Sequence, residues 1–217
     1  MNDLYYGDNI DVLRESIADE SIDLIYLDPP FNSKQEYNRL FKTPDGNDSE
    51  AQITAFEDTW HWGRQAEIEF DDLLRQPNVH LAEMMRSIRA FLGENDMMAY
   101  LTMMASRLLE IHRVLKSTGS MYLHCDPSAS HYLKIVLDGV FGKELFRNEI
   151  VWKRTSGHSD ARGYGSTHDT ILFYAKSNEF LWNDIYQPYE DSYVEEYYRY
   201  EDDDGRRFMS GDLGAAG

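Results

Sequence analysis

A chain of 217 residues suits one domain, or one domain with an appendage, and its 42% hydrophobic and 13% aromatic content excludes global disorder. The single cysteine, Cys125, excludes an intrachain disulfide, and no run of 18 apolar residues could span a membrane. The net charge of −18 opposes binding to phosphate backbones, so a nucleic-acid partner would need a local basic surface or one outside this sequence. Met1 leads into a polar, acidic segment without an apolar signal region, which fits a cytoplasmic protein.

The N-terminal third predicts a strand, a helix and a second strand. Residues 4–7 form a short apolar run, and Asp8 or Asn9 then caps a helix with apolar side chains on one face. Residues 22–27 are mostly apolar, as in a strand buried on both faces. Two prolines follow Asp28, so this strand must end there.

The rest of the chain alternates between helical and strand patterns. Residues 32–95 are polar, with a helical second half, and are interpreted as an insertion. An amphipathic helix starts at Met97 and is closed by Gly119. Residues 120–125 form a strand, and Asp126 and Pro127 start a helix that Gly142 ends. Two more strands are expected near 148–153 and 169–175.

This order predicts an α/β domain with a partial Rossmann-like sheet, largely parallel and with helices on both faces. Residues 1–31 and 96–182 would form the core, and residues 32–95 the polar helical insertion. Residues 183–217 would be an acidic, tyrosine-rich tail. Within it, residues 190–204 hold eight acidic residues and one arginine, typical of a solvated helix face.

Three polar groups follow predicted strands, and in an open α/β sheet such groups meet in one crevice. They are Gly7-Asp8-Asn9, Asp28-Pro29-Pro30-Phe31 and His124-Cys125-Asp126. The second group presents only acceptors, the Asp28 carboxylate and the Pro29 carbonyl. A pair of acceptors suits an exocyclic amino group and stabilises the positive charge that grows as its nitrogen attacks a methyl group. Phe31 supplies a flat face on which an extruded base can stack.

The segment Leu27-Asp28-Pro29-Pro30-Phe31-Asn32 resembles the catalytic motif of the DNA amino-methyltransferases, which act on N6 of adenine or N4 of cytosine. Further segments resemble one bacterial group of the beta class, in which this motif precedes the main cofactor loop. They are Tyr6–Asn9, Ala55–Trp60, Ser120–Pro127, Phe146–Arg154 and His168–Phe173.

The resemblance implies an S-adenosylmethionine-dependent enzyme that methylates N6 of adenine in double-stranded DNA. It makes Asp28, Pro29, Pro30 and Phe31 catalytic. Asp8 and Asn9 would contact the adenosine end of the cofactor, and Asp28 would also lie beside it. An N-cap role explains Asp8 equally well without a ligand. His124 and Cys125 are neighbours in the sequence, and no second cluster of metal-ligating residues accompanies them. We therefore expect no metal site here.

The segment 153–168 holds three cations and one acid, so it is a candidate DNA-contacting loop. Lys153, Arg154 and Arg162 would meet phosphates, and Tyr164 could stack on a base. A solvated hairpin loop without function is the equal alternative.

The family's Gly-rich cofactor turn, often Phe-x-Gly-x-Gly, does not occur in these 217 residues. We therefore expect the sequence to be the N-terminal part of a longer enzyme, or half of a split one. The expected partners are DNA, the C-terminal half or a partner chain, a restriction subunit and a second copy in a homodimer.

Three alternatives stay open. Methylation of N4 of cytosine needs the same geometry, although Asp at the first motif position favours adenine by family analogy. A ribosomal RNA guanine-N2 methyltransferase would need a Gly-rich loop before Asp28, where only 27 residues stand. A non-catalytic subunit of a DNA-modification system, or an acidic interaction module, would show no methyl transfer.

Overall fold

The computed structural model describes residues 2–30, 60–156, 159–160, 162–184, 186 and 188–210. The chain divides into two compact units, residues 1–181 and 182–217, and each is described by itself. In the part of the chain that the structure describes, no helix combines the length and apolarity needed to cross a bilayer.

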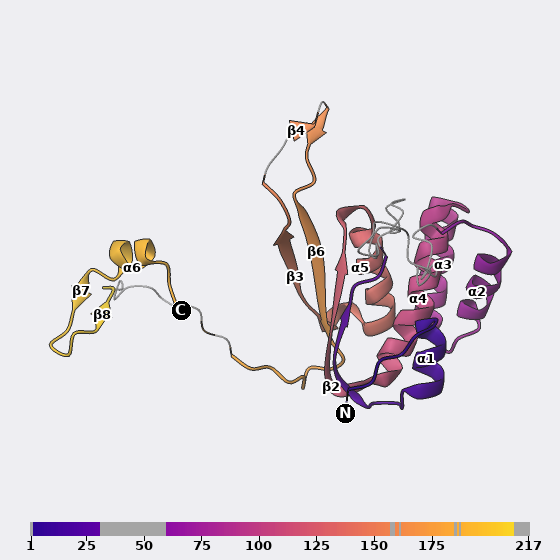
Figure 1. Cartoon of the computed structure of the whole chain (residues 1–217), viewed down its shortest axis with the longest axis horizontal. Helices are drawn as coiled ribbons and strands as arrows, with labels where there is room; N and C mark the ends of the chain where they lie inside the picture. Colours follow the sequence, from indigo (N-terminus) through magenta and orange to yellow (C-terminus); the bar gives the residue numbers. More distant parts are fainter. Residues whose placement is uncertain are drawn as a thin grey trace, which may run out of the picture. The chain divides into compact units, whose positions relative to one another are not determined.

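The larger unit contains a four-stranded sheet in the order β1-β2-β6-β3 (Figure 1). Its strands are β1 (Ile22–Leu27), β2 (Leu115–Cys125), β3 (Phe146–Lys153) and β6 (His168–Ala175). β1 and β2 pair in parallel, whereas β2 with β6 and β3 with β6 are antiparallel. The predicted α/β class is confirmed. The sheet is mixed, because β3 and β6 form a hairpin and two strands joined in that way must run in opposite directions.

The helices of the larger unit lie together on one side of this sheet in Figure 1. They are α1 (Asn9–Ser16), α2 (Arg64–Leu74), α3 (Val79–Leu92), α4 (Asp96–Val114) and α5 (Pro127–Phe141), followed by the 3-10 turn η1 (Lys143–Leu145). α4 and α5 carry the largest sets of buried side chains, so they form the centre of the core.

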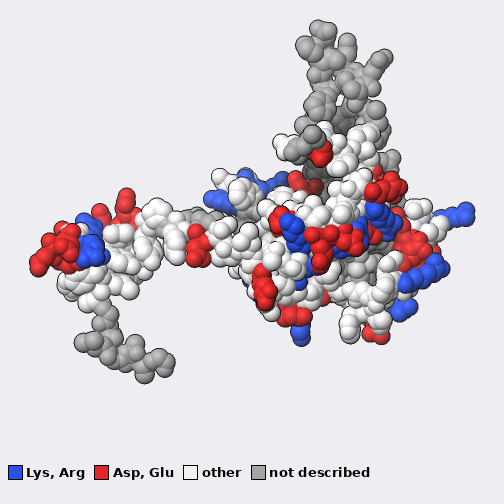
Figure 2. Space-filling view, turned by 90° about the horizontal axis from the view of Figure 1, so that it is seen from below, with Lys and Arg blue, Asp and Glu red and all other residues white. Residues whose placement is uncertain are grey.

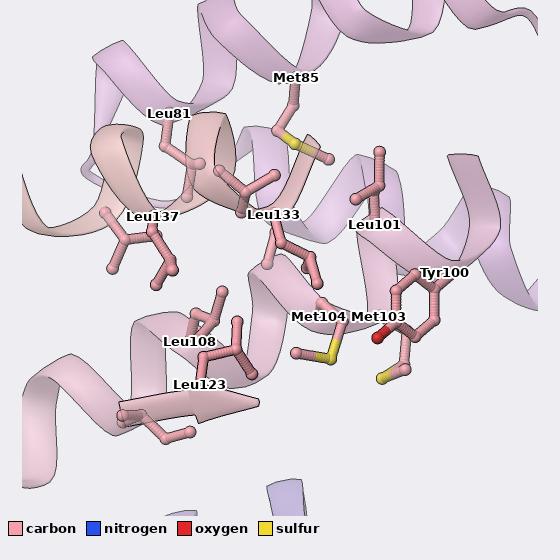
Figure 3. Packing of buried hydrophobic residues seen from close by; sticks show 14 of the residues in the cluster. Leu81, Met85, Tyr100, Leu101, Met103, Met104, Leu108, Leu123, Leu133 and Leu137 are labelled. Atoms are coloured by element: carbon pink, nitrogen blue, oxygen red, sulfur yellow. The ribbon is translucent and has the colours of Figure 1, made fainter. Parts of the chain in front are cut away.

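Buried leucines and methionines from three helices and β2 pack together in this core (Figure 3). Leu81 and Met85 of α3 belong to it, although the sequence sets this region apart as an insertion. α3 approaches α5 closely at Gly139, where a Cβ would lie 2.6 Å from the Met84 side chain. The Asn78 side chain also donates a hydrogen bond of 3.0 Å to the Gly139 carbonyl. The second half of that region is therefore part of the folded core.

The two faces of the sheet differ in their burial. Side chains that alternate along β1 and β2, such as Ile25, Met121 and Leu123, pack against the helices. The opposite face carries Leu24 and Tyr26 of β1, which are 61% and 56% exposed, and Trp152 of β3, which is 58% exposed. Among the described residues, helices cover only the first face.

Two local expectations are wrong. Residues 4–7 form no strand, because no described strand pairs with them and Leu4 is almost fully exposed. Gly119 does not close α4, which ends at Val114, but lies inside β2. Pairing of Ile22 with the buried Leu115 brings residues 115–119 into the sheet, and this tertiary contact overrides the helical pattern.

The remaining elements are short. β4 (Ser159–Asp160) and β5 (Gly163–Tyr164) pair near the end of the β3–β6 hairpin. The smaller unit contains α6 (Asp191–Tyr197) and the hairpin of β7 (Tyr200–Glu201) and β8 (Arg207–Phe208). Tyr193 stacks on Tyr189 and on Tyr197, so tyrosine contacts order this unit.

Candidate functional site

A cavity of about 610 Å³ lies at the carboxyl end of β1. Its polar wall consists of Gly7, Asp8 and Asn9 at the start of α1, together with Asp28, Pro29 and Pro30 after β1. The remaining lining residues are mostly apolar or aromatic and come from β1, from α4 and from the residues before α2: Tyr26, Leu27, Trp60, Met103, Met104, Arg107, Leu108 and Ile111. Residues of two of the three polar groups expected to converge thus line one cavity, and His124 of the third group contacts Asp28 of its wall.

Asp28 stands where the sheet ends, because two successive prolines cannot continue the ladder of backbone hydrogen bonds. Its side chain is 63% exposed, so one face of the carboxylate is open to a ligand. Burial, and then the charge of Asp28, raise the pKa of the neighbouring Tyr26.

Asp8 has two structural partners. Its Oδ1 accepts a hydrogen bond of 3.1 Å from the Ile10 backbone, so Asp8 caps α1. Arg107 of α4 donates to both Asp8 oxygens at 2.7 and 3.0 Å and to the Asn9 side chain at 2.8 Å. The expected capping role is confirmed, and Arg107 fixes both side chains at the cavity wall. Gly7 has φ +140°, a conformation that favours glycine, immediately before them.

A line of contacts runs from Asp28 through β2 to β6. His124 Nδ1 lies 3.1 Å from Asp28 Oδ1, and His124 Nε2 lies 3.1 Å from Asp169 Oδ2. Arg154 donates to the other Asp169 oxygen at 3.2 Å. The sequence placed His124 in one of the three polar groups expected to converge, but gave neither His124 nor Asp169 a specific role. The antiparallel register that brings Asp169 to His124 has no local sequence signal.

The four candidate DNA-contacting residues lie on the β3–β6 hairpin. Lys153 ends β3 and is exposed, and the Arg154 side chain is 56% exposed despite its contact with Asp169. Arg162 is also exposed, and Tyr164 of β5 is fully exposed. These side chains are therefore accessible to a partner.

Asp126 and Cys125 have structural explanations. Asp126 caps α5, because its Oδ1 accepts from the backbones of Ser128 and Ala129 at 3.1 and 3.2 Å. Cys125 is buried, and burial raises the pKa of its thiol to about 12, which makes it a poor nucleophile. The described residues contain no group of three or more His, Cys, Asp or Glu side chains arranged to hold a metal ion.

Phe31, the fourth residue of the expected catalytic motif, lies outside the described residues, as do residues 55–59. Trp60, which follows them, lines the cavity and contacts Tyr100 edge to face, with ring centroids 5.3 Å apart. An aromatic surface is therefore present on the cavity wall.

Comparison with known proteins identifies the protein family to which the chain belongs. A family model described as DNA methylase, of the N6/N4 methyltransferase type, matches residues 22–210. The chain belongs to this family of S-adenosylmethionine-dependent methyltransferases, which act on N6 of adenine or N4 of cytosine in DNA.

Individual relatives come from restriction-modification systems. The Mod subunit of the type III enzyme StyLTI of Salmonella typhimurium is 26% identical over 196 residues, which is 89% of this chain and 26% of the relative. The type II methyltransferase M.EcaI of Enterobacter cloacae is 34% identical over 86 residues, 39% of this chain and 19% of the relative. The EcoP15I Mod subunit of Escherichia coli is 26% identical, over 82% of this chain and 24% of the relative.

The chain thus spans about a quarter of the length of these relatives. Among solved structures, the cytosine-N4-specific PvuII DNA methyltransferase is similar, with 14% identity and a TM-score of 0.43. The alignment covers 81% of this chain and 49% of that protein.

Proposed function

We propose that this chain carries the methyl-transfer centre of an S-adenosylmethionine-dependent DNA methyltransferase that acts on N6 of adenine. The observation that carries the proposal is the exposed Asp28 carboxylate, followed by two prolines, at the mouth of a cavity shared with Asp8 and Asn9. Family membership supports the same reaction class.

The residues proposed as catalytic are Asp28, Pro29, Pro30 and Phe31. The Asp28 carboxylate and the Pro29 carbonyl would accept the two N–H bonds of the target amino group. Two acceptors localise the nitrogen lone pair, which is otherwise delocalised into the base, and stabilise the positive charge that develops on the nitrogen. Phe31 would stack on the base after it leaves the duplex.

The residues of the cavity fit S-adenosylmethionine, which supplies the methyl group when it is bound. The volume of about 610 Å³ lies in the range of small-molecule sites. Asp8 and Asn9 would contact the adenosine end, where apolar side chains such as Met103 and Leu108 give it a surface to pack on. The carboxylates of Asp8 and Asp28 complement the positive charge of the cofactor.

The proposed DNA contact is the β3–β6 hairpin, with Lys153, Arg154 and Arg162 toward phosphates and Tyr164 available to stack. The net charge of −18 is divided between the two units, and −11 of it lies on residues 1–181. Residues 182–217 hold ten acidic and three basic side chains, so a net charge of −7 belongs to the smaller unit. Figure 2 shows acidic side chains gathered there, whereas both signs are mixed over the larger unit.

Methylation of N4 of cytosine by the same acceptors is the alternative activity. Two relatives named above are Mod subunits, which supports a restriction-modification system with a restriction subunit as partner. The N-terminal part of a longer enzyme, or of a split one completed by a partner chain, would fit the quarter of their length that the chain spans. Residues 1–31 and 96–182 would then be the catalytic core, with residues 32–95 inserted and their second half packed on that core, and 183–217 leading to the target-recognition part.

The test is methyl transfer from labelled S-adenosylmethionine to DNA by the full-length protein, with N6-methyladenine and N4-methylcytosine separated by mass spectrometry. Asp28→Ala should lower kcat by about a hundredfold or more, equivalent to about 3 kcal/mol, because one of two acceptors is lost. Asp23→Ala is the matched control, since Asp23 is an aspartate on β1, the strand that precedes Asp28, and pairs with Lys116 at 2.8 Å. A parent protein without transfer would overturn the function, and an Asp28→Ala variant as active as the control would overturn the assignment of Asp28.

A further inference from the structure

His124 and Asp169 lie beside Asp28 because of the register of the sheet. Leu27 pairs with Leu123 in the parallel β1–β2 ladder, so Asp28 and His124 follow at the same level on adjacent strands. His124 pairs with Ile171 in the antiparallel β2–β6 ladder, and Asp169 lies two residues from Ile171 on the same face. Three polar side chains from three strands therefore form one row across the sheet.

The burial of this row increases away from the cavity. The side chains of Asp28, His124 and Asp169 are 63%, 18% and 5% exposed, respectively. A buried carboxylate needs hydrogen-bond donors, and Asp169 has them in His124 at 3.1 Å and Arg154 at 3.2 Å. Asp169 is thus held on both oxygens, and it can fix the orientation of the imidazole between itself and Asp28.

An imidazole held in this way fixes Asp28 in turn. A carboxylate oxygen only accepts, so the imidazole holds both carboxylates when both ring nitrogens carry a proton, with Nδ1 donating to Asp28 Oδ1 and Nε2 to Asp169 Oδ2. The contact occupies one Asp28 oxygen and leaves the other for the target amino group. A catalytic acceptor that is held before the substrate arrives need not be reorganised during the reaction.

We propose that His124 is a positioning residue that holds the Asp28 carboxylate for the target amino group, with Asp169 as its anchor. The inference rests on the proposed function, because it assigns a role around the same carboxylate. A positioning role differs from a purely structural one in a testable way. If His124 positions Asp28, the ring nitrogen that faces Asp28 matters more for turnover than the one that faces Asp169.

Two amide substitutions separate the two sides of the ring. The amide nitrogen of asparagine occupies a position close to histidine Nδ1, whereas that of glutamine lies close to Nε2. His124→Asn should keep the donor to Asp28, and His124→Gln should keep the donor to Asp169 alone. His131→Asn is the control, because His131 is an exposed histidine on α5.

In methyl transfer by the full-length protein, His124→Gln should lower kcat by about ten- to a hundredfold, since misplacing a catalytic group by about 1 Å costs this much. His124→Asn should lose clearly less, and KM for DNA and for S-adenosylmethionine should stay within about twofold in both variants. Equal kcat for the two variants, or a loss confined to KM, would overturn the inference.

A second measurement does not depend on activity. In the folded protein labelled with ¹⁵N-histidine, the imidazole signals of His124 are identified by their loss in His124→Asn. Asp28→Asn should shift the Nδ1 signal, and Asp169→Asn should shift the Nε2 signal. If the Nδ1 signal is the same in the parent and in Asp28→Asn, the contact is absent and the inference fails, even where the parent transfers methyl groups. A parent that transfers none, with both shifts observed, overturns only the proposed function.

Discussion

At the scale of single residues, the cavity depends on how its carboxylates are held. Arg107 is 15% exposed and donates to Asp8 and Asn9 from α4, about a hundred residues further along the chain. A planar guanidinium holds a carboxylate in a fixed orientation, which a lysine ammonium cannot do. Arg107 therefore determines where the polar wall of the cavity lies relative to its apolar wall.

We predict that Arg107→Ala weakens S-adenosylmethionine binding by about tenfold, or about 1.4 kcal/mol, because Asp8 and Asn9 lose their fixed orientation. Arg107→Lys should recover only part of this loss. Calorimetric titration of the full-length protein with the cofactor measures the effect, and Arg86→Ala, at an exposed arginine of α3, is the control. Unchanged affinity in Arg107→Ala would mean that Asp8 and Asn9 do not contact the cofactor.

The sequence reveals some of these residues and not others for a physical reason. Asp28 can be found because two prolines after an apolar run mark the end of a strand. Arg107, His124 and Asp169 depend on contacts across 45 to 99 positions of the chain. Such pairs follow from the packing of α1 on α4 and from the register of β6, and neither leaves a local pattern in the sequence.

At the scale of elements, α5 shows how local signals fix a boundary. Asp126 accepts two backbone N–H groups, Pro127 occupies the first turn and Gly142 ends the helix with φ +95°. All three signals lie within the helix or next to it, which explains why this helix was predicted with its correct ends. The prediction that Gly119 closes α4 was wrong because the end of this helix depends on a distant contact. The pairing of Leu115 with Ile22 draws the chain into the sheet before Gly119.

We predict that Asp126→Ala lowers the free energy of unfolding by about 1 kcal/mol, because two N–H groups at the start of α5 lose their acceptor. Asp126→Asn should be close to the parent, since the amide oxygen can still accept both bonds. Urea denaturation followed by circular dichroism gives the difference. Full stability of Asp126→Ala, together with weaker cofactor binding, would instead assign Asp126 to a ligand.

At the scale of the whole larger unit, the sheet has one face covered by helices and one without such a cover among the described residues. The second face carries exposed apolar side chains on β1 and β3, including Leu24, Tyr26, Ile150 and Trp152. β1 is also the edge of the four-stranded sheet, so one side of its backbone has no described partner strand. Exposed apolar side chains beside an open strand edge are typical of a surface that another segment covers.

The α/β class could be predicted because the periodicities of 2 and 3.6 residues are local properties. The mixed direction of the strands could not, because apolar runs alone do not show which way a neighbour runs. The same limit applies to residues 4–7, whose composition suits a strand but which have no described partner to pair with.

We predict that residues 1–217, produced on their own, self-associate through the open face and edge of β1 and bind S-adenosylmethionine weakly. Burying apolar surface contributes about 25 cal/mol per Å², so even a few exposed side chains favour association. The double substitution Leu24→Lys and Tyr26→Lys should shift sedimentation velocity profiles toward the monomer, since charge on an edge strand opposes pairing.

The control is Phe91→Lys on α3, which removes an apolar side chain that is 79% exposed but lies away from the sheet. Phe91→Lys should leave self-association unchanged, because Phe91 is not part of the proposed contact at β1. This result would show that losing exposed apolar area elsewhere does not weaken the association. The prediction is wrong if the unsubstituted chain is monomeric at tens of micromolar, or if it binds the cofactor with micromolar affinity by itself. The open face of the sheet would then be stable in water without a second segment packed on it. Association that both substitutions weaken equally would place the contact outside β1.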